Sequence, residues 1–437
     1  MSELAPGCAD QTPAHADTRG SLGVAFRTLG CKVNRVESES IAAELLAAGA
    51  RMVDDDEADV VIINTCTVTG EADSKVRKAV RHALAAPHAP IVVVTGCGVA
   101  LNPTSFSALG TRVVIEPDKD RVAGRVTELL ALHETTGLIT ARGPGFRTRA
   151  LLKVQDGCDA FCAYCIVPYA RGVPRAVPLD QIASQARALV DAGAREIVLT
   201  GINIGRYVHG DATLADVVEA VAASGVERLR LSSIEPLHLT SEFLRVLSQT
   251  PSCCPHLHVP LQSGSDAVLS AMGRRYTAAQ FAERIAAARA ALPGLAVTTD
   301  VMCGFPGETD EDALATLQLC ESVGFSALHV FRYSARPGTP AATMPGRIAP
   351  RVIAARAARL RAYGERLQAD HVASRIGSSA CVLVETAKAD ESGRGTTEDH
   401  LRVTVPGAAS QVGQSLRVCL RLGSDGALLG EPEPGAC

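Results

Sequence analysis

The sequence predicts an α/β protein in three parts: a small parallel sheet with helices, a partial barrel of six strand–helix units, and a small all-β barrel. Three observations indicate this. Strand and helix patterns alternate between residues 22 and 132, and a second, longer alternation begins at residue 150. After a long arginine-rich helical stretch, only short β runs broken by glycine and serine remain.

The first part, residues 22–132, is expected to form an N-terminal α/β domain. Its strand patterns cover residues 23–28, 60–64, 91–95 and 112–115, and its helical patterns cover residues 37–48 and 71–85. Strands that alternate with helices in this way form parallel sheets. Residues 1–21 are expected to be a disordered lead-in, and residues 133–149, which include Gly143, Pro144 and Gly145, a linker.

The second part, residues 150–370, contains six strand patterns, at residues 150–154, 196–199, 228–231, 256–259, 296–300 and 327–331. Helical patterns such as residues 179–192, 278–292 and 310–323 lie between them, and a long helix is expected over residues 351–369. Six such units predict a partial (β/α) barrel, and barrels of this kind carry their chemistry at the carboxyl ends of the strands. The third part, residues 371–437, has β runs at residues 380–385, 401–405, 416–421 and 427–429.

The composition narrows the possible functions and the cellular location. The chain has 437 residues and a formal net charge of −4, so any nucleic-acid contact must come from local basic patches. No apolar run is long enough for a membrane helix, and the first residues lack a basic start followed by an apolar stretch, so we expect a cytoplasmic protein. Its fourteen cysteines therefore favour metal-binding or catalytic roles over disulfides.

The densest cysteine motif is GCDAFCAYC at residues 157–165, in which Cys158, Cys162 and Cys165 follow the first barrel strand. A [4Fe–4S] cluster normally takes four thiolates, so three local thiolates would leave one iron open for another ligand. A zinc site is the alternative, but zinc would need a fourth cysteine or histidine nearby and none follows soon. We interpret the motif as a cluster site.

Three further cysteines, Cys31, Cys66 and Cys97, each follow a strand of the N-terminal domain. Because the carboxyl ends of parallel strands meet at one edge, these residues are expected to converge on a second cluster. The alternative is that they are ordinary buried cysteines. The other eight are interpreted as structural or incidental, with Cys303 singled out because it ends a predicted barrel strand: Cys8, Cys253, Cys254, Cys303, Cys320, Cys381, Cys419 and Cys437.

The cysteine loops and several other stretches resemble the methylthiotransferase family of radical S-adenosylmethionine (SAM) enzymes over about residues 22–430. The N-terminal stretches are TLGCKVN at 28–34, NTCTVT at 64–69 and TGC at 95–97. Those in the barrel are LSSIEP at 231–236, PLQSGS at 260–265, GFPGET at 304–309 and YSARPGT at 333–339. The C-terminal module is similar to a TRAM domain, an RNA-binding β-barrel.

The resemblance implies two [4Fe–4S] clusters and SAM as cofactors. SAM would bind the open iron of the barrel cluster, and its reductive cleavage would yield a 5′-deoxyadenosyl radical. By the same resemblance, Tyr164 would pack on the adenine, Gly201 and Asn203 would face the methionine end, Gln262 would bond the ribose or carboxylate, and Gly304 would lie near the adenine. Each of these glycines could equally be an ordinary tight turn.

Two stretches favour the branch of the family that adds a methylthio group to N6-threonylcarbamoyladenosine at position 37, beside the tRNA anticodon: Lys32-Val33-Asn34, and GTTEDHLRV at 395–403. The implied partners are the tRNA anticodon stem-loop, a low-potential electron donor and a sulfur donor. One departure is Gly98, where an aromatic residue is expected after the third cysteine. The cysteine ligand is unaffected by this departure, but the packing of that loop is not predicted.

Other targets and one other class of function remain possible at this stage. The same chemistry could act on isopentenyladenosine in tRNA or on an aspartate of a small-subunit ribosomal protein, and the chain could instead be a non-catalytic iron–sulfur RNA-binding sensor. Seven arginines between residues 347 and 375, against Glu365 and Asp370, could contact tRNA phosphates or form a solvated helix face. Arg171 and Arg175 could contact phosphate or be solvated loop charges.

Overall fold

The computed structural model describes residues 22–67, 70–129, 148–424, 426–435 and Cys437. The predicted lead-in, Cys8 and most of the predicted linker lie outside these residues. No helix within the described ranges is both long and apolar enough to span a membrane.

The N-terminal domain is a parallel five-stranded sheet in the order β2-β1-β3-β4-β5. The four predicted strands are confirmed as β1 (Gly23–Thr28), β3 (Val60–Thr65), β4 (Ile91–Gly96) and β5 (Val113–Ile115), and β2 (Arg51–Met52) is added at the edge. Side chains of β3 alternate between two hydrophobic cores and are buried on both faces, as expected of a central parallel strand.

Helices cover both faces of this sheet. One face packs against α1 (Lys32–Ala47) and α5 (Val122–Leu129), and the other against α2 (Gly70–Leu84), α3 (Cys97–Leu101) and α4 (Thr104–Ser107). Helix α1 begins five residues earlier than its predicted start at residue 37. Its N-cap is Cys31, whose side chain makes no capping hydrogen bond, so the usual sequence signal of a helix start is missing.

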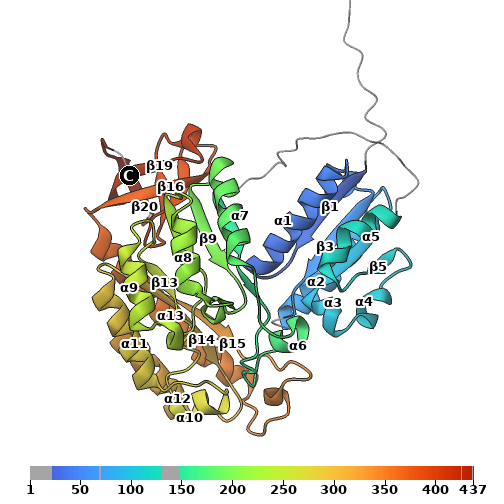
Figure 1. The fold of residues 1–437 in the computed structure, drawn as a ribbon. Coiled ribbons are helices and arrows are strands. Elements are labelled where there is room, and N and C mark those ends of the chain that lie inside the picture. Colours follow the sequence, from blue (N-terminus) through green and yellow to red (C-terminus); the bar gives the residue numbers. More distant parts are fainter. Residues whose placement is uncertain (1–21, 68–69, 130–147, 425, 436) are drawn as a thin grey trace, which may run out of the picture.

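All six predicted barrel strands are confirmed, as β6 (Arg149–Lys153), β9 (Glu196–Thr200), β12 (Arg228–Leu231), β13 (His256–His258), β14 (Ala296–Cys303) and β15 (Ala327–Arg332). They form two parallel three-stranded sheets, which single bridges join between the β12 and β13 regions. Within the described ranges no pairing links β15 to β6. The barrel is therefore partial. Figure 1 shows the N-terminal domain beside it, and helix α1 contacts β6 of the barrel.

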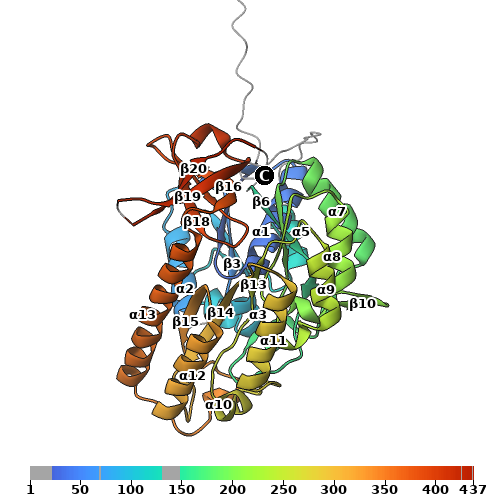
Figure 2. The same cartoon turned by 90° about the vertical axis from the view of Figure 1, so that its left-hand side faces the viewer.

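The outer helices of the barrel are α7 (Leu179–Asp191), α8 (Leu214–Ala222), α9 (Ser241–Gln249), α11 (Ala278–Ala291), α12 (Asp310–Val323) and α13 (Pro350–Arg375) (Figures 1 and 2). Strand alternation sends Leu229 and Leu231 into the hydrophobic core under these helices. Arg228 and Arg230 therefore point to the opposite, inner face of the curved sheet, which we call the lumen.

The C-terminal module is a closed five-stranded barrel in the order β16-β17-β18-β20-β19. Its strands are β16 (Ser379–Ala387), β17 (Gly393–Thr396), β18 (Arg402–Val405), β19 (Ser415–Leu422) and β20 (Leu428–Pro432). The sequence analysis missed β17 because Gly-Arg-Gly-Thr has no apolar alternation. A Cβ on Gly395 would lie 2.2 Å from the Leu383 carbonyl oxygen, so close pairing with β16 requires glycine there.

The expectation that the cysteines do not form disulfides was wrong at one pair, although both cysteines are structural as interpreted. Cys381 of β16 forms a disulfide with Cys437, with 5.5 Å between their Cα atoms. The two are 56 residues apart in sequence, so their spacing carries no signal of the pairing. Cys303 ends β14 as predicted, and its side chain is buried in the hydrophobic core of the barrel.

Candidate active site

The loop that carries Cys158, Cys162 and Cys165 connects β7 (Gln155–Asp156) to α6 (Val167–Arg171), beyond the carboxyl end of β6. It begins at Gly157, which has φ +72° and where a Cβ would lie 2.1 Å from the Val173 carbonyl oxygen. Only glycine fits that position. The loop is also held by a hydrogen bond from the Cys158 amide to the Gly172 carbonyl at 3.0 Å.

The three thiols of this loop lie close enough to influence one another. Burial raises the pKa of Cys158 and raises that of Cys165 to about 12, and the neighbouring thiol of Cys162 adds to both shifts. Such thiols become thiolates only beside a strong positive charge, which bound iron supplies. A trio of convergent thiols in a short loop therefore fits three corners of an iron–sulfur cluster.

The second trio lies at one edge of the N-terminal sheet. Cys31 follows β1, Cys66 follows β3 and Cys97 follows β4, and these strands are neighbours in the sheet. The loops are in contact, because a Cβ on Gly30 would lie 2.6 Å from the Cys66 Cβ, and one on Gly96 would lie 2.6 Å from the Thr65 carbonyl oxygen. Cys66 and Cys97 are buried and Cys31 is exposed.

Asn34 holds these loops together. The sequence analysis assigned it no such role, although it lies in the same stretch as Cys31. Its amide nitrogen donates to the Leu29 carbonyl at 3.1 Å, to the Asn64 side-chain oxygen at 3.1 Å and to the Thr65 carbonyl at 2.8 Å. Its amide oxygen accepts from the Cys31 thiol at 3.4 Å. One buried side chain thus joins the Cys31 loop to the end of β3.

Arg171 connects the two cysteine trios. It is buried, and its guanidinium contacts the Glu37 carboxylate at 2.8 Å, the Asp156 carboxylate at 2.9 Å and the Asn34 amide oxygen at 2.8 Å. Phosphate contact and solvation, the two alternatives for Arg171, are therefore both wrong. Arg175 is exposed.

Helix packing brings the same two regions together. Helix α3 begins at Cys97 and packs against α6, which begins two residues after Cys165. Arg336, in the YSARPGT stretch, adds a further link between the barrel and the N-terminal domain: its guanidinium pairs with Asp73 at 2.8 Å and hydrogen-bonds Thr67, the residue after Cys66.

Gly98 departs from the expected aromatic residue, and the structure shows what its small size permits. Its amide donates to the Thr65 hydroxyl at 3.1 Å, and a Cβ at this position would lie 3.0 Å from that oxygen and 3.6 Å from the Phe106 ring. The start of α3 therefore approaches β3 too closely for a larger side chain unless Thr65 moves.

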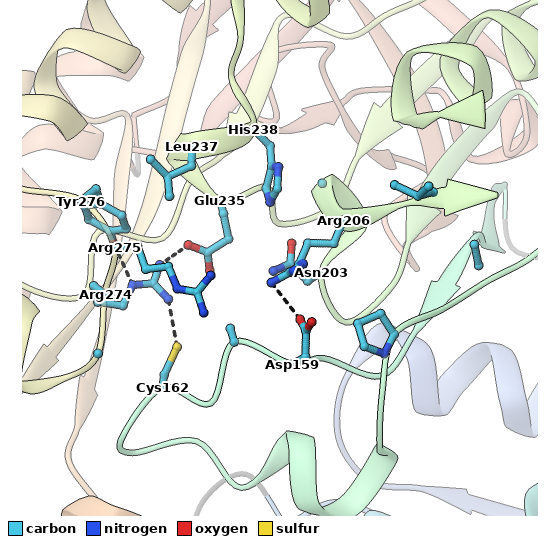
Figure 3. A pocket seen from close by; sticks show the side chains of 16 residues that line it. Asp159, Cys162, Asn203, Arg206, Glu235, Leu237, His238, Arg274, Arg275 and Tyr276 are labelled. Carbon is cyan, nitrogen blue, oxygen red and sulfur yellow. Dashed lines mark hydrogen bonds and ion pairs between the residues drawn. The ribbon is translucent and has the colours of Figure 1, made fainter. Parts of the chain in front are cut away.

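A cavity of about 650 Å³ opens beside Cys162 (Figure 3). Arg274 lines one side of this cavity, where it donates to the Cys162 sulfur at 3.5 Å and pairs with Glu235. Asp159 pairs with Arg206 at 2.8 Å. Asn203 also lines the cavity, and its side-chain oxygen is buried and has no hydrogen-bond partner among the described residues. A nucleoside-sized polar ligand fits this volume and would satisfy that oxygen.

The residues predicted to contact SAM lie in different places. Asn203 lines the cavity, whereas Gly201 packs behind it, where its Cβ would lie 2.9 Å from the Gln155 carbonyl oxygen. Gln155, which sequence reasoning missed, accepts hydrogen bonds from the amides of Ile202 and Asn203 at 3.2 and 2.9 Å and so shapes this loop.

Tyr164, Gln262 and Gly304 are not among the lining residues of this cavity. Tyr164 packs against a small core that includes Met272 and Phe305, and Gln262 is bridged to β14. Gly304 faces the Ile353 side chain. Glu235 and Arg274 do line the cavity although no role was predicted for them. Glu235 lies in the LSSIEP stretch, and that family stretch was the sequence signal that could have pointed to it.

Comparisons with known proteins identify the family. Residues 152–320 match the radical SAM superfamily, and residues 23–115 match the uncharacterized protein family UPF0004. Threonylcarbamoyladenosine tRNA methylthiotransferase MtaB of Bacillus subtilis is 38% identical over 418 residues, covering 90% of this chain and 93% of the relative. The chain belongs to the radical-SAM methylthiotransferase family. The methylthiotransferase accordingly uses two [4Fe–4S] clusters and SAM.

Other relatives agree with this assignment of the methylthiotransferase. The MtaB protein of Chlamydia pneumoniae is 38% identical, covering 82% of this chain and 85% of the relative. The tRNA-2-methylthio-N(6)-dimethylallyladenosine synthase of Wolinella succinogenes is 32% identical, covering 93% and 98%. Among solved structures, the radical SAM methyltransferase TsrM from Kitasatospora setae shares the fold with a TM-score of 0.55 at 16% identity, covering 74% of this chain and 77% of that one.

Proposed function

We propose that this methylthiotransferase converts N6-threonylcarbamoyladenosine at position 37 of tRNA into its 2-methylthio derivative. The observation that carries the proposal is the pattern of identities. Relatives named for threonylcarbamoyladenosine from Bacillus subtilis, Chlamydia pneumoniae and Thermotoga maritima share 37–38% of residues. Relatives named for dimethylallyladenosine from Wolinella succinogenes, Cereibacter sphaeroides and Leifsonia xyli share 32–35%, and the MtaB protein of Treponema pallidum also lies in this lower range at 32%.

The six converging cysteines are the proposed cluster ligands: Cys158, Cys162 and Cys165 in the barrel, and Cys31, Cys66 and Cys97 in the N-terminal domain. When bound, the barrel cluster and SAM supply a radical that can remove hydrogen from an unactivated carbon, which no acid–base side chain can do. The protein itself has to hold the two cluster sites and the adenine base in fixed positions. Asn203, Glu235 and Arg274 are the proposed walls of the SAM cavity.

The proposed RNA partner is the anticodon stem-loop, whose adenine would have to be splayed out of the loop to reach the cysteine trios. On α13, Arg351, Arg359, Arg361 and Arg366 are exposed, whereas Arg356 pairs with Glu308 and Asp310, and Arg375 with Asp399. The basic excess available to phosphates on this helix is therefore smaller than its sequence indicates.

A second basic surface lies where β6 meets the C-terminal barrel. It is a groove of about 430 Å³, lined by Arg149 of β6 and by Arg394 and Arg402 of the module that resembles a TRAM domain. Glu385 also lines it and pairs with Arg149 at 3.2 Å, so Arg394 and Arg402 carry its excess positive charge. This groove supports an RNA-binding role for that module. A low-potential electron donor, a sulfur donor and a cytoplasmic location complete the proposal.

The test uses anaerobically reconstituted protein with SAM, a chemical reductant and tRNA that carries either N6-threonylcarbamoyladenosine or isopentenyladenosine. Mass spectrometry of the digested nucleosides should show the 2-methylthio product only with the former. Product only with the latter would reassign the substrate, and modification of a ribosomal-protein aspartate would reassign the class of target. Absence of SAM cleavage in the loaded protein would favour a non-catalytic sensor.

A further inference from the structure

Two histidines and an aspartate gather on three neighbouring strands of the barrel. His258 lies on β13, Asp300 on β14 and His329 on β15, and these strands form one parallel sheet (Figure 2). Leu257 and Val301, which neighbour the first two in sequence, are buried in the core under the outer helices. Strand alternation therefore turns His258 and Asp300 toward the lumen, and the register that pairs Asp300 with His329 puts His329 on the same face.

The three side chains come together at the spacing of metal ligands. Nε2 of His258 lies 3.3 Å from one carboxylate oxygen of Asp300, and Nδ1 of His329 lies 3.4 Å from the other. The candidate ligand atoms of all three residues lie within 4.8 Å of one another. Charge-assisted hydrogen bonds are shorter, at about 2.7–2.9 Å, whereas two ligands about 2.1 Å from a tetrahedral zinc ion are about 3.4 Å apart. The observed distances therefore suit ligands around an ion better than direct hydrogen bonds.

An ion from the solvent can reach this position. The exposed fraction of the side chain is 13% for His258, 23% for Asp300 and 55% for His329. The carboxylate of Asp300 is ionised at neutral pH and supplies a negative charge, and neutral imidazoles are common ligands of divalent transition metals. The set therefore combines partial burial, which orients the ligands, with an open side through which the ion can enter.

A hydrogen-bonded partner orients His258 for metal binding. Its Nδ1 lies 2.9 Å from the hydroxyl oxygen of Thr298, and that hydroxyl also lies 3.2 Å from Nε2 of His256. A hydroxyl can accept and donate at once, so it can take the N–H of His258 while it donates to His256. Metal-binding histidines usually give their second ring N–H to such a partner, which fixes the ring and leaves the other nitrogen free for the metal.

We propose that His258, Asp300 and His329 bind a divalent transition-metal ion, with zinc as the ion that best suits two imidazoles and one carboxylate. Three protein ligands leave at least one coordination position of a tetrahedral ion open, as in catalytic zinc sites. That position would face the lumen and take water or an oxygen atom of a bound substrate. The site shares no residue with the six cysteines, and the inference does not depend on which nucleoside is modified.

The test measures zinc in holoenzyme whose two clusters have been reconstituted first, so that iron already occupies the cysteine thiols. The protein is dialysed anaerobically against a series of zinc concentrations, and zinc, iron and sulfide are determined. Wild-type protein should retain about one zinc ion per chain at saturation. His329→Ala and Asp300→Asn should lose this zinc, and Thr298→Val should bind it about 10–100-fold more weakly, as loss of a ligand's hydrogen-bond partner predicts.

His209→Ala is the matched control, because His209 is an exposed histidine on β10 (Val208–His209) and should leave zinc binding unchanged. Equal iron content and circular dichroism of all variants exclude misfolding. X-ray absorption at the zinc edge should show nitrogen and oxygen at about 2.0–2.2 Å, and sulfur at about 2.3 Å would place the zinc on cysteines and overturn the proposal. Wild-type holoenzyme that retains no zinc, or His329→Ala that retains as much as wild type, overturns it as well.

Discussion

Replacing Arg171 with methionine should loosen the contact between the two halves of the active site. Methionine keeps much of the aliphatic length but removes the cation that faces Glu37 and Asp156. The side chain of Glu37 is only 5% exposed, so its charge would lose its closest partner while remaining buried. Breaking a buried ion pair on one side costs about 3–5 kcal/mol.

The cost for Arg171→Met should fall at the lower end of that range, because Glu37 keeps Lys119 and a Lys153 contact at 3.8 Å. It should also depend on pH. Burial opposes ionisation of Glu37, but its contacts with Arg171 and Lys119 together outweigh that effect and lower the pKa of the carboxyl. A carboxyl with a lowered folded-state pKa stabilises the protein above its unfolded value, and this stabilisation is lost as the pH falls through the folded value.

Hydrogen exchange of α1 and α6 is the suitable assay, because it reports local opening in a protein of several domains. Arg171→Met should speed exchange in both helices at pH 7 and narrow the difference from wild type toward pH 3. Adding Glu37→Gln should restore part of the protection, because it removes the stranded charge. Protection unchanged in Arg171→Met, or a double variant that is worse than the sum of the single ones, would refute this account of the contact.

Three further predictions concern the cysteine sites. Reconstituted protein should bind roughly eight iron atoms, as two four-iron clusters require, and Cys31→Ala about four; iron content that is unaffected by Cys31→Ala would remove the second site. Folded Cys66→Ala should still release 5′-deoxyadenosine from SAM but form no methylthio product, and Cys162→Ala should do neither; a methylthio product from Cys66→Ala with a loaded barrel cluster would contradict the division of roles. Gly157→Ala should lose the barrel cluster, measured as iron and visible absorbance, because its Cβ would lie 2.1 Å from a carbonyl oxygen; normal loading would show that the loop can adapt.

Local patterns in the sequence determined the strand framework and the grouping of the cysteines. Period-two and buried-strand patterns located all six strands of the partial barrel within a few residues. Parallel topology then requires that residues following adjacent strands meet at one edge, which is why Cys31, Cys66 and Cys97 could be grouped although they lie far apart in the chain. The barrel cysteines were easier to group, because all three lie close together in the sequence.

Only the tertiary structure decided which side chains join the two cysteine sites. Arg171 and Glu37 are 134 residues apart, and Arg336 and Asp73 are 263 apart. An arginine after a loop has the same local sequence signal whether it meets solvent, phosphate or a buried carboxylate, so Arg171 could not be assigned in advance. The Cys381–Cys437 disulfide and the glycine-rich β17 depend likewise on contacts between segments that the closed C-terminal barrel brings together. Periodicity and spacing report what one segment prefers, whereas ion pairs and cavities arise where distant segments pack together.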